Sequence, residues 1–181
     1  MLNKKSYKFK LCLVGEQAVG KTCLIRKYVF NEFSDGYICT LGAKVIKKKV
    51  SILHPKTKDI VDIELMIWDI MGQKGFRRLL QEAYFLGAQG IIAVCDNTRE
   101  NTLSELVGWI EGIQKIAKDV PTVFLGNKCD LIDLQEIGLN ELKSFSSEYE
   151  SPGAYLTSAK TGTNVEQAFG IISNRILKEI L

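Results

Sequence analysis

The segment Gly15-Glu16-Gln17-Ala18-Val19-Gly20-Lys21-Thr22 decides the fold of this chain. It follows an apolar run, Lys8–Val14, and leads into a segment of helical period. Because glycine lets a backbone wrap around an anion, successive N–H groups of this G-x-x-x-x-G-K-T loop can point at phosphates, and the helix N-terminus adds positive charge. Lys21 can reach the outer phosphates, and the Thr22 hydroxyl can hold Mg²⁺. The segment therefore predicts a triphosphate cradle between a strand and a helix.

Outward from this loop, short β-branched runs alternate with segments of helical period. This alternation is typical of an α/β fold, a mostly parallel sheet with helices on both faces. The expected strands are Lys8–Val14, Lys44–Leu53, Ile60–Trp68, Gly90–Asp96, Thr122–Asn127 and Ala154–Thr157, and the expected helices are Gly20–Phe30, Gly75–Leu86, Glu100–Ala117, Leu139–Ser147 and Val165–Ile180. Only the short turn HPKTKD joins the second strand to the third, so these two form one antiparallel hairpin at the edge of the six-stranded sheet.

Composition indicates one globular domain. The chain has 181 residues, of which 46% are hydrophobic and 25% charged, and its formal net charge is +3. This excess of positive charge is too small to indicate a nucleic-acid partner, and no apolar run approaches the ~18 residues of a membrane-spanning helix. The five cysteines form an odd set without a C-x-x-C pair, and the single histidine, His54, argues against a zinc cage and is expected to be a solvent-exposed turn residue. We expect a single cytoplasmic domain over residues 1–181 that acts as a monomer.

A second motif, Asn127-Lys128-Cys129-Asp130, ends the apolar strand TVFLG and lies at the carboxyl edge of the sheet. The Asp130 carboxylate can accept hydrogen bonds from the ring N–H and the exocyclic amine of guanine, whereas adenine offers no matching pair of donors. The loop Thr157-Ser158-Ala159-Lys160 can give a backbone N–H to the guanine carbonyl oxygen, and the stem of Lys128 or Lys160 can lie over the ring. These motifs favour GTP and GDP over adenine nucleotides.

A third motif, Trp68-Asp69-Ile70-Met71-Gly72-Gln73, follows another strand. Asp69 can hold Mg²⁺ through a water molecule, and Gly72 can present its backbone N–H to the terminal phosphate. Gln73 can orient an attacking water. The motif thus predicts hydrolysis in addition to binding.

In this order, the motifs resemble those of the Ras superfamily of small GTPases, most closely its Rab-like branch, from Lys8 to Ile180. The resemblance implies a small G domain with the P-loop NTPase fold, a molecular switch whose loops around 31–42 and 69–86 report the state of the bound GTP or GDP. It also implies that Phe33 packs on the guanine and that Thr40 is the second hydroxyl ligand of Mg²⁺. The implied nucleotide-binding residues are Gln17, Ala18, Val19, Gly20, Lys21, Thr22, Cys23, Phe33, Thr40, Gly72, Asn127, Lys128, Asp130, Ser158, Ala159 and Lys160; the catalytic residues are Gln73, Thr40 and Lys21; and the metal ligands are Thr22, Thr40 and Asp69.

The resemblance further implies an exchange factor, a GTPase-activating protein and effector proteins as partners, with a role in signal transduction or vesicle trafficking. Two departures from the family pattern bear on hydrolysis: Gln17 stands where a small residue is common, and Met71 stands where alanine is usual. A second hypothesis is therefore a GTP-bound binding module with impaired hydrolysis. A nucleoside or adenylate kinase is a third hypothesis, which the guanine motif disfavours.

The sequence contains no lipidation motif. No cysteine follows Cys129, and Met1-Leu2 excludes N-myristoylation. We expect no lipid anchor in this chain, and at most a weak peripheral contact of its N-terminal lysines with an anionic membrane.

Overall fold

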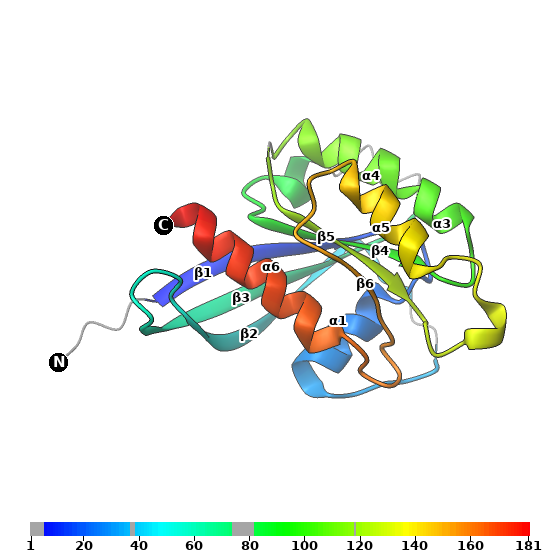
Figure 1. Ribbon diagram of the computed structural model, residues 1–181, viewed down its shortest axis with the longest axis horizontal. Helices are drawn as coiled ribbons and strands as arrows, with labels where there is room; N and C mark the ends of the chain where they lie inside the picture. Colours follow the sequence, from blue (N-terminus) through cyan, green and yellow to red (C-terminus); the bar gives the residue numbers. More distant parts are fainter. Residues whose placement is uncertain (1–5, 37–38, 74–81, 118) are drawn as a thin grey trace.

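The computed structural model describes residues 6–36, 39–73, 82–117 and 119–181. A six-stranded sheet with the strand order β2-β3-β1-β4-β5-β6 forms the centre of the molecule (Figure 1). The strands are β1 (Ser6–Val14), β2 (Ala43–Leu53), β3 (Ile60–Ile70), β4 (Gly90–Asp96), β5 (Thr122–Asn127) and β6 (Ala154–Leu156). The β2–β3 pair is antiparallel, and the other neighbouring strands pair in parallel. The predicted fold class, including the antiparallel hairpin at the edge, is confirmed.

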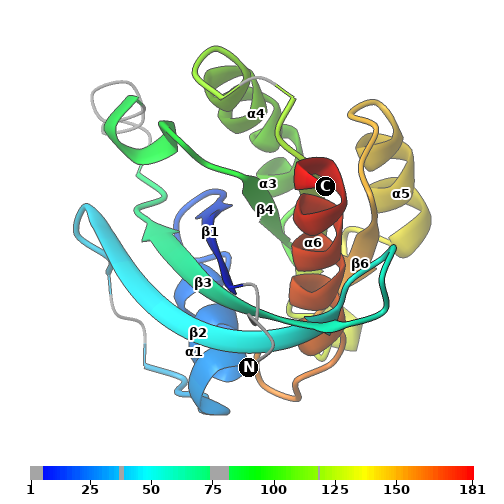
Figure 2. The ribbon, with the colours of Figure 1, turned by 90° about the vertical axis from the view of Figure 1, so that its left-hand side faces the viewer.

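Helices cover both faces of the sheet. They are α1 (Lys21–Phe30), α3 (Asn101–Ser104), α4 (Leu106–Gln114), α5 (Leu139–Ser147) and α6 (Val165–Ile180). Because alternate side chains of a strand point to opposite faces, Leu11 and Leu13 of β1 join a cluster with α1 and α6, and Cys12 joins a second cluster with α3, α4 and α5. Figure 2 shows the β2–β3 hairpin curving along the edge of the molecule. The two cores pack against both faces of the sheet, and the carboxyl ends of its strands carry the predicted motifs.

One predicted helix is divided in two. The sequence predicts a single helix over Glu100–Ala117, but α3 ends at Ser104 and α4 begins at Leu106. The hydroxyls of Thr102 and Ser104 donate to the carbonyl oxygens of Arg99 and Asn101, at 2.7 and 2.9 Å. Such side-chain bonds compete with the regular backbone bonds of a helix, which accounts for the short first piece. The predicted helix Gly75–Leu86 lies mostly outside the described residues, and residues 82–85 of it are helical.

The expectation for His54 is wrong. Its side chain is buried in the turn between β2 and β3, with 7% exposed. The Nδ1 atom accepts hydrogen bonds from the backbone N–H groups of Lys56 and Thr57, at 3.2 and 3.0 Å. Because a tight turn leaves N–H groups without backbone partners, the imidazole closes the turn instead of pointing into solvent.

Candidate functional site

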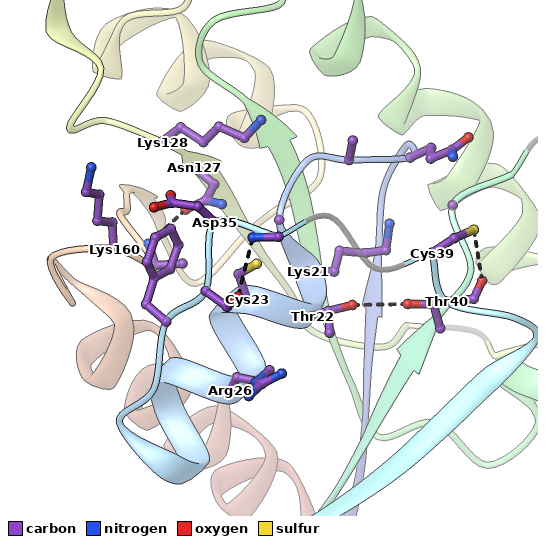
Figure 3. A pocket seen from close by; sticks show the side chains of 18 of the residues that line it. Lys21, Thr22, Cys23, Arg26, Asp35, Cys39, Thr40, Asn127, Lys128 and Lys160 are labelled. Atoms are coloured by element: carbon purple, nitrogen blue, oxygen red, sulfur yellow. Dashed lines mark hydrogen bonds between the residues drawn. The ribbon is translucent and has the colours of Figure 1, made fainter.

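A cavity of about 460 Å³ opens at the carboxyl ends of the strands (Figure 3). Its walls come from the loop before α1, from residues 32–36, 39 and 40, from the end of β3, and from the loops after β5 and β6. The cavity brings together the predicted residues Gln17, Ala18, Gly20, Lys21, Thr22, Cys23, Phe33, Thr40, Gly72, Gln73, Asn127, Lys128, Asp130, Ala159 and Lys160. Val19, Ser158 and Asp69 of the predicted set are buried behind this wall.

The backbone of the phosphate loop requires its glycines. Gly15 and Gly20 have φ values of +139° and +99°, which L side chains rarely adopt. A Cβ on Gly15 would come within 2.1 Å of the Val94 carbonyl oxygen, and one on Gly20 within 2.2 Å of the Asn127 amide nitrogen. The loop is therefore packed tightly against β4 and β5, which fixes where the N-terminus of α1 points.

Lys21 folds over this loop. Its Nζ donates to the carbonyl oxygens of Gly15 and Glu16, at 2.6 and 2.8 Å. Burial of the side chain lowers the pKa of Lys21 to about 8, although the carboxylates of Asp69 and Glu16 act in the opposite direction. A buried ammonium held by neutral carbonyls gains from a nearby anion, so the charge of Lys21 favours a phosphate in the cavity.

Three oxygen-bearing side chains from separate elements meet beside Lys21. The Thr22 hydroxyl donates to Oδ2 of Asp69 at 2.6 Å and lies 3.1 Å from the Thr40 hydroxyl, which itself donates to Asp69 at 3.4 Å. Thr22 lies in the first turn of α1 and Thr40 precedes β2 (Figure 3), and Asp69 lies near the end of β3. The three predicted metal ligands thus lie within hydrogen-bonding distance of one another.

The donor set fits Mg²⁺. The side chain of Asp69 is buried, and its Oδ1 has no hydrogen-bond partner within residues 6–36, 39–73, 82–117 and 119–181. Burial raises the pKa of Asp69, although hydrogen bonds from Thr22 and Thr40 and the charge of Lys21 oppose this rise. Hydroxyl and carboxylate oxygens are the ligands that hard cations prefer, and Mg²⁺ keeps several waters and phosphate oxygens in its shell. A cation or its bound water would satisfy the orphaned oxygen.

Asn127 connects three segments at the end of the cavity that the loops after β5 and β6 form. Its amide nitrogen donates to the Val19 carbonyl at 2.9 Å, and its Oδ1 accepts from the Thr157 hydroxyl and the Ala159 backbone N–H at 3.4 and 3.3 Å. The loop 157–160 is predicted to offer a backbone N–H to the guanine carbonyl oxygen, and in this structure the Ala159 N–H donates to Asn127. Lys128 and Lys160 flank this end of the cavity (Figure 3).

The segment just after β3 packs closely against the phosphate loop. A Cβ on Gly72 would come within 2.5 Å of the Glu16 carbonyl carbon and 2.6 Å of the Gln17 nitrogen, so glycine alone fits this close approach. Gln73 and Gln17 are exposed and line the cavity next to it. The predicted switch residues 74–81 lie outside the described residues.

The sequence analysis missed a polar network behind the phosphate loop. Asp96 at the end of β4 binds Arg99 and Lys128, and Arg99 also donates to the Gln17 carbonyl oxygen. The position of Asp96 at the carboxyl end of a buried strand was the available signal.

Comparisons with known proteins agree with this geometry. The sequence model of the Ras family matches residues 10–178. The chain is 37% identical to the Ras-related protein Rab-1A of Dictyostelium discoideum, over 94% of this chain and 81% of that protein. It is 36% identical to the GTP-binding protein ypt1 of Schizosaccharomyces pombe, over 94% and 80% of the two chains. It is also 35% identical to the Ras-related protein Rab-8B of Pongo abelii, over 99% and 84%.

Proposed function

Because the chain belongs to the Ras family, as a Rab-like small GTPase that binds GTP or GDP with Mg²⁺ and hydrolyses GTP, we propose that the cavity of Figure 3 is its nucleotide site. The observation that carries this proposal is the meeting of Thr22, Thr40 and Asp69 beside the buried Lys21. Three oxygen ligands and one cation in this arrangement suit a metal-bound triphosphate.

We assign the base to the end of the cavity formed by the loops after β5 and β6. Asp130 accepts from the ring N–H and the amine of guanine, and the stems of Lys128 and Lys160 cover the ring faces. Phe33 packs against the base from the loop before β2. In these assignments one carboxylate selects guanine, because only Asp130 accepts hydrogen bonds from the two donors that adenine lacks.

We assign the phosphates to the other end. The backbone N–H groups of residues 17–22 and the Lys21 ammonium hold the β- and γ-phosphate oxygens. Thr22, Thr40 and, through a water, Asp69 would hold Mg²⁺, which neutralises the charge that develops on the phosphates. Gly72 donates its N–H to the γ-phosphate, and Gln73 orients the attacking water. When the γ-phosphate leaves, Thr40 and Gly72 lose their contacts, so the loops around 31–42 and 69–86 change together.

We propose slow intrinsic hydrolysis. No arginine occurs in residues 31–42, so none is placed there to stabilise the leaving charge. Intrinsic turnover is then on the order of 10⁻⁴ s⁻¹, as in unassisted Ras-type enzymes. Membership of the family implies exchange factors, GTPase-activating proteins and effectors in general. We place the contacts of the effectors on the two switch loops of a monomeric domain that spans residues 1–181.

The Rab and ypt relatives support a role in vesicle trafficking. We propose that the chain acts from the cytoplasm, where such switches meet their partners. Within the described ranges, no helix combines the length and apolar character needed to cross a membrane.

The experiment is an analysis of the nucleotide that the purified protein retains, followed by single-turnover hydrolysis of GTP with Mg²⁺. We expect about one guanine nucleotide per chain, mostly GDP, as for other slow Ras-type enzymes. The Thr22→Asn variant should bind GTP much more weakly than GDP, because it loses the metal-ligating hydroxyl. Thr57→Asn, in the exposed hairpin turn, is the matched control. Retention of an adenine nucleotide, or unchanged GTP binding by Thr22→Asn, would refute the assignment.

A further inference from the structure

The carboxylate of Asp96 is the centre of a buried polar network. Its side chain is 1% exposed. One oxygen accepts from the Thr98 backbone N–H and hydroxyl, at 3.0 and 2.7 Å, and the other accepts from Arg99 Nε and Lys128 Nζ, at 3.0 and 2.6 Å. A buried charge is costly unless it is paired and hydrogen-bonded, and here both oxygens are satisfied. Burial by itself would raise the pKa of Asp96, but the hydrogen bonds from Lys128 and Thr98 hold it below its usual range.

Arg99 extends this network to the phosphate loop. While its Nε is bonded to Asp96, its Nη2 donates to the Gln17 carbonyl oxygen at 3.1 Å. The guanidinium group is planar, so the directions of its donors are fixed relative to one another. The position of the Gln17 carbonyl is thereby tied to the position of the Asp96 carboxylate, although 82 residues separate Arg99 from Gln17 in the sequence.

Lys128 binds the same oxygen of Asp96 as Arg99 does, at 2.6 Å. It has a left-handed backbone with φ of +68°, and it lies two residues before Asp130 in the loop after β5. Its side chain lines the cavity at the base end (Figure 3). Asp96 therefore connects a residue at the base end of the cavity to the backbone at the phosphate end, and neither Asp96 nor Arg99 lines the cavity itself.

We propose that Arg99 is a positioning residue that holds the phosphate loop at Gln17 in its nucleotide-binding conformation and so slows the release of guanine nucleotide. The inference rests on the proposed nucleotide site. The Gln17 carbonyl and the N–H of Ala18 belong to the same peptide unit, so a hydrogen bond that fixes the carbonyl also fixes the direction of this N–H toward the phosphates. Without Arg99, the peptide can rotate away from the bound nucleotide.

A second contact supports the same role for this side of the loop. Trp109 of α4 donates its indole N–H to the Glu16 carboxylate at 3.3 Å. Consecutive loop residues, Glu16 and Gln17, are thus held by side chains that come from α4 and from the segment before α3. The segment from Asp96 to Trp109 thus packs behind the phosphate loop. Within this segment, Arg99 is the residue whose side chain binds the loop backbone.

The experiment measures the dissociation of fluorescent GDP, with Mg²⁺ and excess unlabelled GDP, from the parent and from Arg99→Gln, Arg99→Lys and Arg175→Gln. Arg175 pairs with Glu179 at 2.7 Å on the exposed face of α6, so its variant removes an arginine–carboxylate pair away from the cavity. We expect Arg99→Gln to release GDP at least about tenfold faster than the parent, or ~1.4 kcal/mol of barrier. Arg175→Gln should match the parent.

Arg99→Lys separates positioning from simple charge pairing. Lysine keeps a positive charge beside Asp96 but lacks the rigid fork that reaches Gln17 at the same time. We expect it to release GDP nearly as fast as Arg99→Gln, with the preference for guanosine over xanthosine nucleotides unchanged in both. Parent-like release from Arg99→Gln, or full rescue by lysine, would overturn the inference. A parent that binds no guanine nucleotide would instead overturn the proposed function.

Discussion

Single side chains at the two ends of the cavity carry different parts of the proposed reaction. Asp130 lines the end of the cavity that we assign to the base, whereas Gln73 and Gly72 line the end that we assign to the phosphates. Substitution at either end therefore has a distinct signature, in selectivity for Asp130 and in rate for Gln73.

Asp130→Asn should weaken GTP binding and shift the preference toward xanthosine triphosphate. The amide replaces one acceptor oxygen by a donor, and the lost hydrogen bonds to a charged group correspond to ~1.5–3 kcal/mol, or about 10- to 100-fold in affinity. Competition between the two nucleotides measures the shift. Asp133→Asn, at an exposed position that does not line the cavity, should behave as the parent. Unchanged affinity for GTP in Asp130→Asn would remove the guanine assignment.

Gln73→Leu should slow single-turnover hydrolysis at least about tenfold, equivalent to ~1.4 kcal/mol of barrier, with little loss of GTP affinity. The ground state is held mainly by Lys21 and by backbone N–H groups, so a residue that orients the water affects the chemical step alone. Gln17→Gly should leave intrinsic hydrolysis similar or faster. Gln167→Leu, on the exposed face of α6, is the control. If Gln73→Leu hydrolysed GTP as fast as the parent, the hypothesis of a GTP-bound binding module would be favoured over that of a switch that hydrolyses GTP through Gln73.

At the scale of elements, the β2–β3 hairpin shows how a turn of six residues is held in shape. The Nδ1 atom of His54 accepts two backbone N–H groups, and the backbone N–H of His54 donates to the Asp59 carbonyl at 2.8 Å. The imidazole acts as the acceptor that a turn usually finds in an asparagine or aspartate side chain. The hairpin is long, so its turn determines the pairing of eleven residue pairs.

His54→Ala should lower the free energy of unfolding by about 1 kcal/mol, because two turn N–H groups lose their acceptor. His54→Asn should recover more than half of this loss, since its Oδ1 can take the place of Nδ1. Urea unfolding of both variants in saturating GDP measures the difference. Equal losses in the two variants would mean that burial of the ring, and not its hydrogen bonds, stabilises the turn.

The sequence predicts those elements and site residues whose requirements are local. The loop Gly15–Thr22 can be predicted from the sequence, because its glycines occupy backbone conformations that other residues rarely adopt. Lys21 and Thr22 directly follow Gly20 in the chain. Arg99 could not be predicted in this way, because its contact with Gln17 depends on how β4 is placed beside β1. The burial of His54 depends on hydrogen bonds that hydrophobic periodicity does not report. The same holds for the division, between Ser104 and Leu106, of the helix predicted over Glu100–Ala117.

Across the whole molecule, Asp96 links stability to pH. Its hydrogen bonds hold the pKa of the carboxyl below its usual range in the folded state, so the unfolded chain binds the proton more readily. The stabilisation is therefore fully present above the ordinary carboxyl range and is lost as the pH falls through the lowered folded pKa.

Asp96→Asn should lower the free energy of unfolding at pH 7 by about 2 kcal/mol, because the buried network loses its charged acceptor. The difference from the parent should stay constant down to about pH 5 and shrink at lower pH. Urea unfolding between pH 7 and pH 3, with GDP and Mg²⁺ in fixed excess, measures this profile. A difference that persists undiminished at pH 3 would show that the carboxylate charge is not its source.

The bonds of Asn127 to Val19, Thr157 and Ala159 join segments that are synthesised far apart in time. The phosphate loop leaves the ribosome early, but the segment that completes the proposed base site follows more than a hundred residues later. At ~5–20 residues per second, the nascent chain spends on the order of 10 s with the loop Gly15–Thr22 complete and the partners of Asn127 after β6 not yet made. The proposed base site can therefore form only after β6 has been made, so a nucleotide bound there would stabilise a nearly complete fold.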